Sequence, residues 1–464
     1  MKYKKFLIDY FPLILVEIYL FLTLYIFLLG PLKFPVENAS YITLMLVAYN
    51  VFLAFGYVTS NKIFAIEIGV DKDYFSKNFF LILILGFFAT LILYKNITFT
   101  HEMSIGGVAD DVYRGLLNPE KAREIYAEKI HSGKYNSNIF YSFYLLFFAW
   151  AKFVILPYIV FFWGKLSVTK KTIGVAVGFF GIFTTLASSV SAIIFNMLFT
   201  IASIFLLLFI KSFHDGENFF KKIKSRLVLL ILSLFLILMC VWHFYSVKND
   251  ANLINDIISE SPMKVRSGAA GQSYLSKFGV LSKKEIHEEH GNIEDKTFFD
   301  DYYEKIAFYM VNGYVGLSYS LNEKFDSTYG VGHSKYLLHV FDNYLGFDIS
   351  KNTFQRKITE KWDENIFWHS FYSHWANDVG FLGVLGVMFF CGIIFSIVYR
   401  SALYRSNVFA VCLIPLFFLM FIYMPANNQV LSFVETMTSF WFLLLALFYS
   451  SKLSFQKNGE KNEI

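Results

Sequence analysis

The sequence predicts an all-α, polytopic membrane protein with about ten transmembrane helices and one large, partly helical external loop. Apolar residues make up 56% of the 464 residues and charged residues only 17%, whereas soluble chains carry about 25% charged residues. Aromatic residues reach 20%, led by 56 Phe, a side chain that partitions favourably into a bilayer. Long apolar runs recur along the chain. These observations exclude an ordinary soluble domain.

Ten of the apolar runs are long enough to cross a membrane as helices, which takes about 20 mostly apolar residues. The first run, from Phe11 to Leu29, is too long for the apolar core of a signal peptide, and no small-x-small cleavage pattern follows it. We predict a tight helical hairpin around 187–191. The predicted spans are 11–31, 41–60, 78–95, 138–164, 172–189, 191–211, 226–246, 377–399, 407–424 and 429–450.

The positions of lysine and arginine predict the orientation of these helices, because basic residues are enriched in loops on the cytoplasmic side. Basic residues fill one set of alternate connections, whereas the short loops 32–40, 188–191 and 425–428 contain only Lys33. Both termini are therefore predicted to be cytoplasmic. The net charge of +5 is spread over these loops, so it does not predict a nucleic-acid partner.

The predicted spans divide the chain into four parts. Residues 1–246 hold helices one to seven with an external segment at 95–137, residues 247–376 form the large external loop, residues 377–450 hold helices eight to ten, and residues 451–464 form a tail. The large loop contains no Ser/Gly-rich linker, so we expect it to fold. Its apolar residues at helical spacing predict an amphipathic helix, and they are Tyr336, Leu337, Val340, Phe341, Tyr344 and Leu345.

Candidate catalytic residues gather where the large loop enters the eighth predicted helix. His369 and His374 lie there with Tyr372 and Asp378. A histidine at this place can act as a general base on a sugar hydroxyl, because its unperturbed pKa is about 6.5. The alternative is an interfacial belt in which His and Trp only anchor the helix end. Gly380 and Gly383, the next glycines along the chain, predict close packing of this helix.

Other segments carry candidate binding residues. Gly330 and Gly332 form a glycine turn before the predicted amphipathic helix, and such a turn can present backbone N–H groups to an anion; most Gly-x-Gly segments are only turns. Arg266 and Arg356 in the large loop and Arg114 in the shorter external segment can hold a diphosphate through paired hydrogen bonds. Exposed arginines often have no such role.

Some ionisable residues leave several interpretations open. Glu17, Lys152 and Glu435 lie inside predicted spans, where charges are costly, so they either pair with one another or line a polar cavity. His287 and His290 have the i, i+3 spacing of metal ligands on a helix, although a solvated helical turn explains the same spacing.

With these features the chain resembles the Wzy-type polymerases of O-antigen or capsule repeat units, within the O-antigen ligase/polymerase superfamily. Members share the layout of ten or more spans with a large late loop. They carry a His-Asn/Ser-x-Tyr segment and two glycines eleven and fourteen residues after the His. The matching residues here are His369, Ser370, Tyr372, Gly380 and Gly383. A Gly-x-Gly before a helix, at Gly330 and Gly332, is similar too.

The chain departs from the family pattern at its arginines. Many members place an arginine after a glycine near the tip of a mid-chain hairpin, where this chain has Ser188-Ser189-Val190-Ser191. A pair of arginine-x10-glycine motifs is also missing. The family role of that arginine must then pass to another residue, and Arg266 is our choice.

The resemblance implies a metal-independent, membrane-embedded glycosyltransferase with a GT-C-like fold and no cofactor, at the periplasmic face of the bacterial inner membrane. Its donor is a glycan on undecaprenyl diphosphate, and its acceptor is a single repeat unit on the same carrier. His369 or His374 then activates the acceptor hydroxyl, and Tyr372 and Asp378 orient the histidine or bind sugar. Arg266, with Arg356 or Arg114, stabilises the departing diphosphate. The bilayer, a chain-length regulator and a flippase are the expected partners.

Three alternatives remain. An O-antigen ligase has the same fold and donor but transfers the polymer to lipid A-core. A flippase or other transporter differs in class, and such proteins usually have short loops, twelve or more spans and repeated halves. A structural or receptor-like membrane protein needs none of the candidate catalytic residues.

Overall fold

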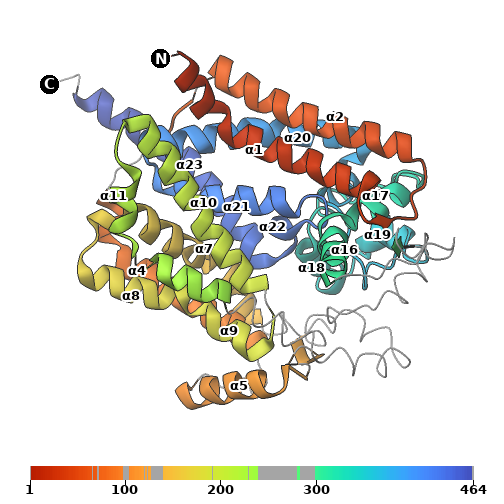
Figure 1. The fold of residues 1–464 in the computed structure, drawn as a ribbon, viewed down its shortest axis with the longest axis horizontal. Coiled ribbons are helices and arrows are strands. Elements are labelled where there is room, and N and C mark those ends of the chain that lie inside the picture. Colours follow the sequence, from red (N-terminus) through yellow and green to blue (C-terminus); the bar gives the residue numbers. More distant parts are fainter. Residues whose placement is uncertain are drawn as a thin grey trace.

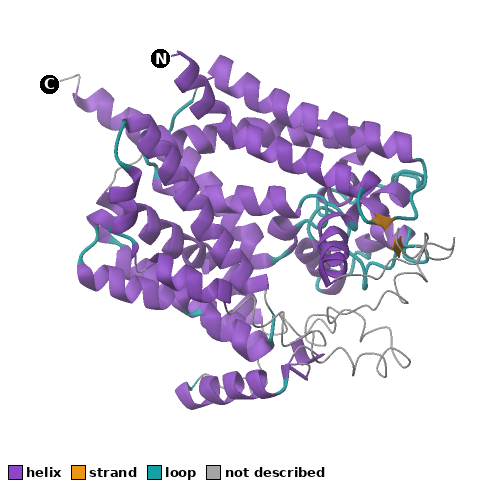
Figure 2. Cartoon of the chain, in the orientation of Figure 1, coloured by secondary structure: helices purple, strands orange, loops and turns teal. Residues whose placement is uncertain are grey.

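The computed structural model describes residues 2–64, 66–69, 73–97, 104–119, 121–122, 124–126, 139–190, 192–227, 229–238, 280–282 and 298–461. Helices form most of this described part, and loops connect them (Figure 2). Apart from them, the described residues hold one antiparallel pair of two-residue strands, β1 (Leu32–Lys33) and β2 (Leu281–Ser282), with Leu32 opposite Ser282.

Among the described residues, six helices are long and apolar enough to cross a membrane, as the predicted multi-pass helical architecture requires. They are Tyr3–Leu29, Ala39–Ile63, Phe140–Lys165, Val168–Ser188, Ala192–Asp215 and Phe371–Arg405. Four shorter apolar helices lie within the other predicted spans, and they are Phe79–Lys95, Leu229–Leu238, Val408–Tyr423 and Val434–Ser450. The total of ten spans stays a prediction.

The elements divide between a helical bundle and a smaller group at one of its ends. The bundle contains α1 (Lys2–Leu29), α2 (Ala39–Thr59), η1 (Ser60–Phe64), α3 (Asp73–Lys77), α4 (Phe79–Ile97), α7 (Ile139–Phe162), η3 (Trp163–Lys165), α8 (Val168–Phe179), α9 (Gly181–Ser188), α10 (Ala192–Asp215), α11 (Phe219–Lys224), α20 (Phe371–Arg405), α21 (Val408–Tyr423), α22 (Gln429–Ser432) and α23 (Val434–Lys461). The smaller group contains α16 (Phe298–Val311), α17 (Gly313–Ser320), α18 (Lys335–Asn343), η5 (Ile349–Asn352) and α19 (Phe354–Lys357).

The two chain ends lie at one end of the bundle, and α16–α19 lie at the other (Figure 1). We call the second one the loop end. There Glu37, in the connection between α1 and α2, accepts hydrogen bonds from Asn322 (2.6 Å) and Lys361 (3.2 Å). Lys357 donates to Asp326 at 2.7 Å, and this bond holds the pKa of the Asp326 carboxyl below its usual value. The contacts of Glu37 fix the smaller group onto the bundle, whereas the Lys357–Asp326 contact lies within the smaller group.

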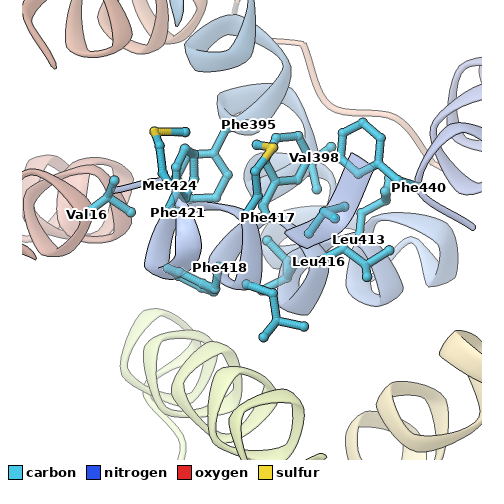
Figure 3. Packing of buried hydrophobic residues seen from close by; sticks show 14 of the residues in the cluster. Val16, Phe395, Val398, Leu413, Leu416, Phe417, Phe418, Phe421, Met424 and Phe440 are labelled. Atoms are coloured by element: carbon cyan, nitrogen blue, oxygen red, sulfur yellow. The ribbon is translucent and has the colours of Figure 1, made fainter. Parts of the chain in front are cut away.

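The core of the bundle is built on α21, whose mostly apolar sequence is buried nearly throughout. Phe395 of α20 lies with its ring centre 4.9 Å from that of Phe421 and 5.4 Å from that of Phe417. Phe440 of α23 contacts Phe417 edge-on at 5.2 Å. Figure 3 shows these rings interdigitating around α21. The high phenylalanine content therefore serves the interior of the bundle as well as its lipid-facing surface.

Glycines set the closest helix contact, between α2 and α20. A Cβ added to Gly56 would lie 1.9 Å from the carbonyl oxygen of Phe389, and one added to Gly392 would lie 2.1 Å from that of Leu53. The two backbones approach this closely because neither glycine has a side chain. The prediction of close packing at Gly380 and Gly383 is wrong: added Cβ atoms there would meet only side chains, at ordinary distance for Gly380 and within the same helix for Gly383.

Helix α20 begins at Phe371, six residues before the predicted span at 377. Its backbone is interrupted at Gly380, which has φ +69° and ψ 167°. Glycine adopts this conformation without steric strain because glycine has no Cβ atom. The sequence prediction missed the first segment because residues 371–378 are rich in polar side chains. The break separates a short polar helical segment from the long apolar one.

The fifth and sixth predicted spans form the expected hairpin, with Ser189 at its turn in a left-handed conformation (φ +53°). Helix α5 (Ile105–Leu117), in the shorter external segment, packs on this turn. Ser189 donates to the carbonyl of Gly115 at 3.1 Å, and Tyr94 of α4 donates to Asp111 at 3.0 Å. The hairpin tip, where the family pattern has an arginine, here carries Ser189, and this serine anchors α5.

At the end that carries the termini, a buried arginine joins three elements. Arg400 of α20 contacts Glu67 at 2.7 Å, Asn61 of η1 at 2.6 Å and Asp9 of α1 at 3.5 Å. Tyr404 donates to the same Asp9. Burial of this charge is tolerated because two carboxylates and an amide satisfy it.

We predict that Gly392→Ala destabilises the protein by about 1–3 kcal/mol, because its methyl group forces α2 and α20 apart. Gly386→Ala is the matched control on the same helix, since a Cβ there meets nothing within 4 Å. Thermal midpoints in detergent should fall for Gly392→Ala and not for Gly386→Ala. Equal midpoints for the two variants would contradict this packing.

Candidate functional site

The carboxylate of Asp378, in the short polar segment of α20, is held by the turn at residues 328–333, which we call the glycine turn. Its Oδ1 accepts from the hydroxyl of Thr328 at 2.5 Å and from the backbone N–H groups of Gly330 at 3.0 Å and Gly332 at 2.8 Å. Its Oδ2 accepts from the backbone N–H of His333 at 2.9 Å. The turn therefore binds an anion, as its sequence suggested, but that anion is the protein's own carboxylate.

His333 completes this arrangement with its side chain. Its Nδ1 lies 2.9 Å from Oδ2 of Asp378, and its ring stacks on Trp375 at 4.4 Å with an interplanar angle of 11°. The side chain of His333 keeps 10% of its surface exposed, whereas that of Asp378 keeps 3%. A carboxylate on Nδ1 favours the tautomer with its proton there, which leaves Nε2 as the acceptor.

The break at Gly380 helps to create the site. In a regular helix the carbonyl of Asn377 would accept from the N–H four residues later, beyond the break. Instead it accepts from the backbone N–H of Thr328 at 3.1 Å and from its hydroxyl at 2.8 Å. The glycine turn thus binds a carbonyl that the break leaves available.

The side-chain amide of Asn377 joins the same segments from the other side. It donates to the carbonyl of Gly332 at 3.0 Å and to Gln355 at 2.9 Å, and its oxygen accepts from the N–H of Phe354 at 2.9 Å. Asn377 is fully buried. It therefore connects α20, the glycine turn and α19, a role that sequence reasoning missed.

The predicted catalytic histidines are both buried. His369 and His374 are each 2% exposed. A Cβ added to Gly316 of α17 would lie 2.7 Å from Nδ1 of His369, so this ring packs directly on that helix. Among the described residues, neither ring nitrogen of His374 has a hydrogen-bond partner. Lys335, His369 and His333 all act electrostatically on the His374 ring.

Tyr372 is fully buried and stacks against Tyr49 of α2 at 4.8 Å and Tyr314 of α17 at 6.4 Å. These contacts hold α20, α2 and α17 together. Its predicted role in sugar binding or in orienting a histidine stays a prediction, and the structure gives it no exposed surface.

The two predicted cations that the structure describes, Arg356 and Arg114, each pair with a neighbouring carboxylate. Arg356 pairs with Glu364 at 3.1 Å and keeps 54% of its side chain exposed. Arg114 pairs with Asp110 at 2.8 Å on α5, which lies away from α19 in Figure 1. Arg266 lies outside the described residues, as do His287 and His290. Lys335, which sequence reasoning passed over, is an exposed cation close to His374.

The structure also describes the three ionisable residues that lie inside predicted spans, Glu17, Lys152 and Glu435. Lys152 of α7 and Glu435 of α23 interact electrostatically across the interface of these two helices. Glu17 of α1 acts in the same way on Tyr372. That these three residues pair with one another or line a polar cavity stays a prediction, and the electrostatic interaction between Lys152 and Glu435 favours the first alternative for those two residues.

His333 is the main residue that sequence reasoning left out of the site. It directly follows Gly332 in the glycine turn, and this position next to a predicted binding residue was the one sequence feature that could have indicated its role. Nothing in the sequence shows that residue 378, 45 positions later, contacts it. The pairing depends on the tertiary fold.

The fold and this site define a multi-pass helical membrane protein with a buried imidazole–carboxylate cluster at one end of its bundle. No family model, curated protein or solved structure matches the chain.

We predict that Gly332→Ala disrupts the site more than Gly330→Ala. A Cβ at Gly332 would lie 2.0 Å from the Thr328 hydroxyl and 2.5 Å from the Asn377 Cβ, so the turn must move away from Asp378. Gly330 meets nothing within 4 Å, and its φ of +86° costs a side chain about 1–2 kcal/mol. Thermal midpoints should fall further for Gly332→Ala, and the reverse order would show that the turn does not depend on this contact.

Proposed function

We propose that this chain is a membrane-embedded glycosyltransferase that joins undecaprenyl-diphosphate-linked oligosaccharide repeat units into O-antigen or capsular polysaccharide, at the periplasmic face of the bacterial inner membrane. The observation that carries the proposal is the cluster of three imidazoles and one carboxylate at the loop end. A proton acceptor is the group that a sugar hydroxyl needs when it attacks a glycosyl donor.

The position of the cluster supports a lipid-linked substrate. His374 and Asp378 lie in the short polar segment of α20, directly before the break at Gly380 and the long apolar segment. His369 lies just before that segment, and His333 contacts it from the glycine turn. A substrate with its lipid tail in the bilayer and its sugars outside meets the protein at such a boundary. The smaller group α16–α19 packs around the cluster and supplies polar surface for the glycan.

The proposed reaction is a displacement at the anomeric carbon of the donor glycan. The acceptor hydroxyl oxygen forms the new bond to that carbon, and the bond from the carbon to the diphosphate oxygen breaks. The hydroxyl proton passes to an imidazole, and undecaprenyl diphosphate leaves with the bonding electron pair. The anomeric centre is inverted. Lys335, an exposed cation that acts electrostatically on His374, can stabilise the leaving diphosphate. Arg266, with Arg356 or Arg114, remains a predicted contributor.

The purified protein in lipid nanodiscs, given a synthetic undecaprenyl-diphosphate repeat unit, should produce a ladder of oligomers on a gel. One undecaprenyl diphosphate should be released for each linkage formed, because each transfer breaks one donor bond. A protein that binds the substrate without forming oligomers would contradict the proposal. Heat-inactivated protein in the same nanodiscs is the control.

A deletion strain distinguishes the related functions through its lipopolysaccharide bands. Loss of the ladder with a single-repeat band retained supports the polymerase. Complete loss of O-antigen from the core would instead identify a ligase. Accumulation of lipid-linked single repeats on the cytoplasmic face would identify a transporter and exclude the transferase.

A further inference from the structure

We propose that His333, oriented by Asp378, is the residue that accepts the proton of the acceptor hydroxyl. This inference rests on the proposed function. It assigns the catalytic base to a histidine outside the segment that the family resemblance matched, and it gives His369 and His374 a packing role.

The first argument is the orientation of the ring. A general base needs a fixed tautomer, and a carboxylate on one ring nitrogen fixes it. The contact of 2.9 Å between Asp378 Oδ2 and His333 Nδ1 does this, and it makes Nε2 the accepting nitrogen. Trp375 stacks on the ring and sets its plane. The backbone on both sides is fixed too, because Asn428 donates to the His333 carbonyl at 2.6 Å.

The second argument is the compensation of charge. After it takes the proton, an imidazolium needs a nearby anion. The Asp378 carboxylate lies in contact with the ring, and three backbone N–H groups and the Thr328 hydroxyl hold that carboxylate in place. Asp378 is therefore a positioning residue. It does not have to move or change its hydrogen bonds during the transfer, which is the preorganisation that such a site requires.

The third argument is access. As whole residues, His333 is 8% exposed, whereas His369 and His374 are each 2% exposed. Among the described residues, no carboxylate contacts the His374 ring nitrogens, so nothing there orients the ring or compensates a proton on it. His369 packs on Gly316. His333 therefore has an orienting anion that His374 does not have among the described residues, and it is more exposed than His374.

The proton transfer balances within the proposed reaction. The acceptor O–H bond breaks and its proton binds to Nε2 of His333. The acceptor oxygen bonds to the anomeric carbon, and undecaprenyl diphosphate departs with the electrons of the broken carbon–oxygen bond. The imidazolium then returns its proton to solvent. The step needs no further reactant.

The test is the polymerisation rate in nanodiscs for a matched set of variants. His333→Gln should lower kcat by about 10²–10⁴-fold, because it removes the base. Asp378→Asn should lower kcat by at least about tenfold with KM unchanged, since the ring loses its orientation and not its substrate contacts. His339→Gln, on the adjacent helix α18, is the control and should keep the wild-type rate, because among the described residues the His339 ring contacts Asn343 and Tyr344, which lie in or next to its own helix.

A second measurement uses the wild-type protein and does not depend on the folding of a variant. Diethyl pyrocarbonate modifies accessible neutral imidazoles, and peptide mass spectrometry locates the modified residues. Loss of activity should follow modification of His333, and the lipid-linked substrate should protect that residue. Loss of activity that follows His369 or His374 instead would overturn the inference.

The outcomes separate the two proposals. A wild-type protein that forms no oligomers overturns the proposed function, and the role of His333 with it. A wild-type protein that forms oligomers while His333→Gln keeps its full rate overturns the role of His333 alone. Addition of imidazole should restore part of the rate to His333→Gly, an effect that a purely structural role for His333 does not predict.

Discussion

The contact between the Asp378 carboxylate and the glycine turn is the interaction on which the rest of the site depends. It connects α20 to the segment that precedes α18 through hydrogen bonds from backbone N–H groups. Because these donors belong to the backbone, substitution of a side chain does not remove them. A buried carboxylate is stable only when hydrogen-bond donors satisfy it, and both oxygens of the Asp378 carboxylate accept hydrogen bonds. Its position then determines where His333 and Trp375 lie.

The break at Gly380 makes this contact possible. A continuous helix would use the carbonyl of Asn377 internally, and the glycine turn would lose the acceptor that Thr328 contacts. The short polar segment of α20 can therefore belong to the smaller group α16–α19 while the long segment belongs to the bundle. The close approach of α2 to Gly392 fixes the long segment in the bundle. One helix thus connects the apolar bundle with the more polar smaller group.

The predicted site residues met different outcomes for physical reasons. Asp378, Gly330 and Gly332 do come together, because a turn rich in free N–H groups and a carboxylate attract each other wherever the fold brings them close. His369, Tyr372 and His374 lie nearby but inside the packed core. Arg114 and Arg356 each pair with a neighbouring carboxylate, which is the usual state of an exposed arginine. Lys335 and His333 were not predicted as site residues, because an isolated lysine or histidine in a loop does not by itself indicate a functional site.

The sequence by itself determined the class of the protein, because apolar length and the bilayer's thickness set a helical, multi-pass architecture without reference to any long-range contact. It also located the segment near residue 370 where polar groups enter the membrane region. Only the tertiary structure decided which groups meet there. The partners of Asp378 lie 45 to 50 positions away along the chain, and neither hydrophobic periodicity nor residue spacing reports on contacts at such separation. The choice of His333 over His369 and His374 depends on burial and on one carboxylate, and both are properties of the folded chain.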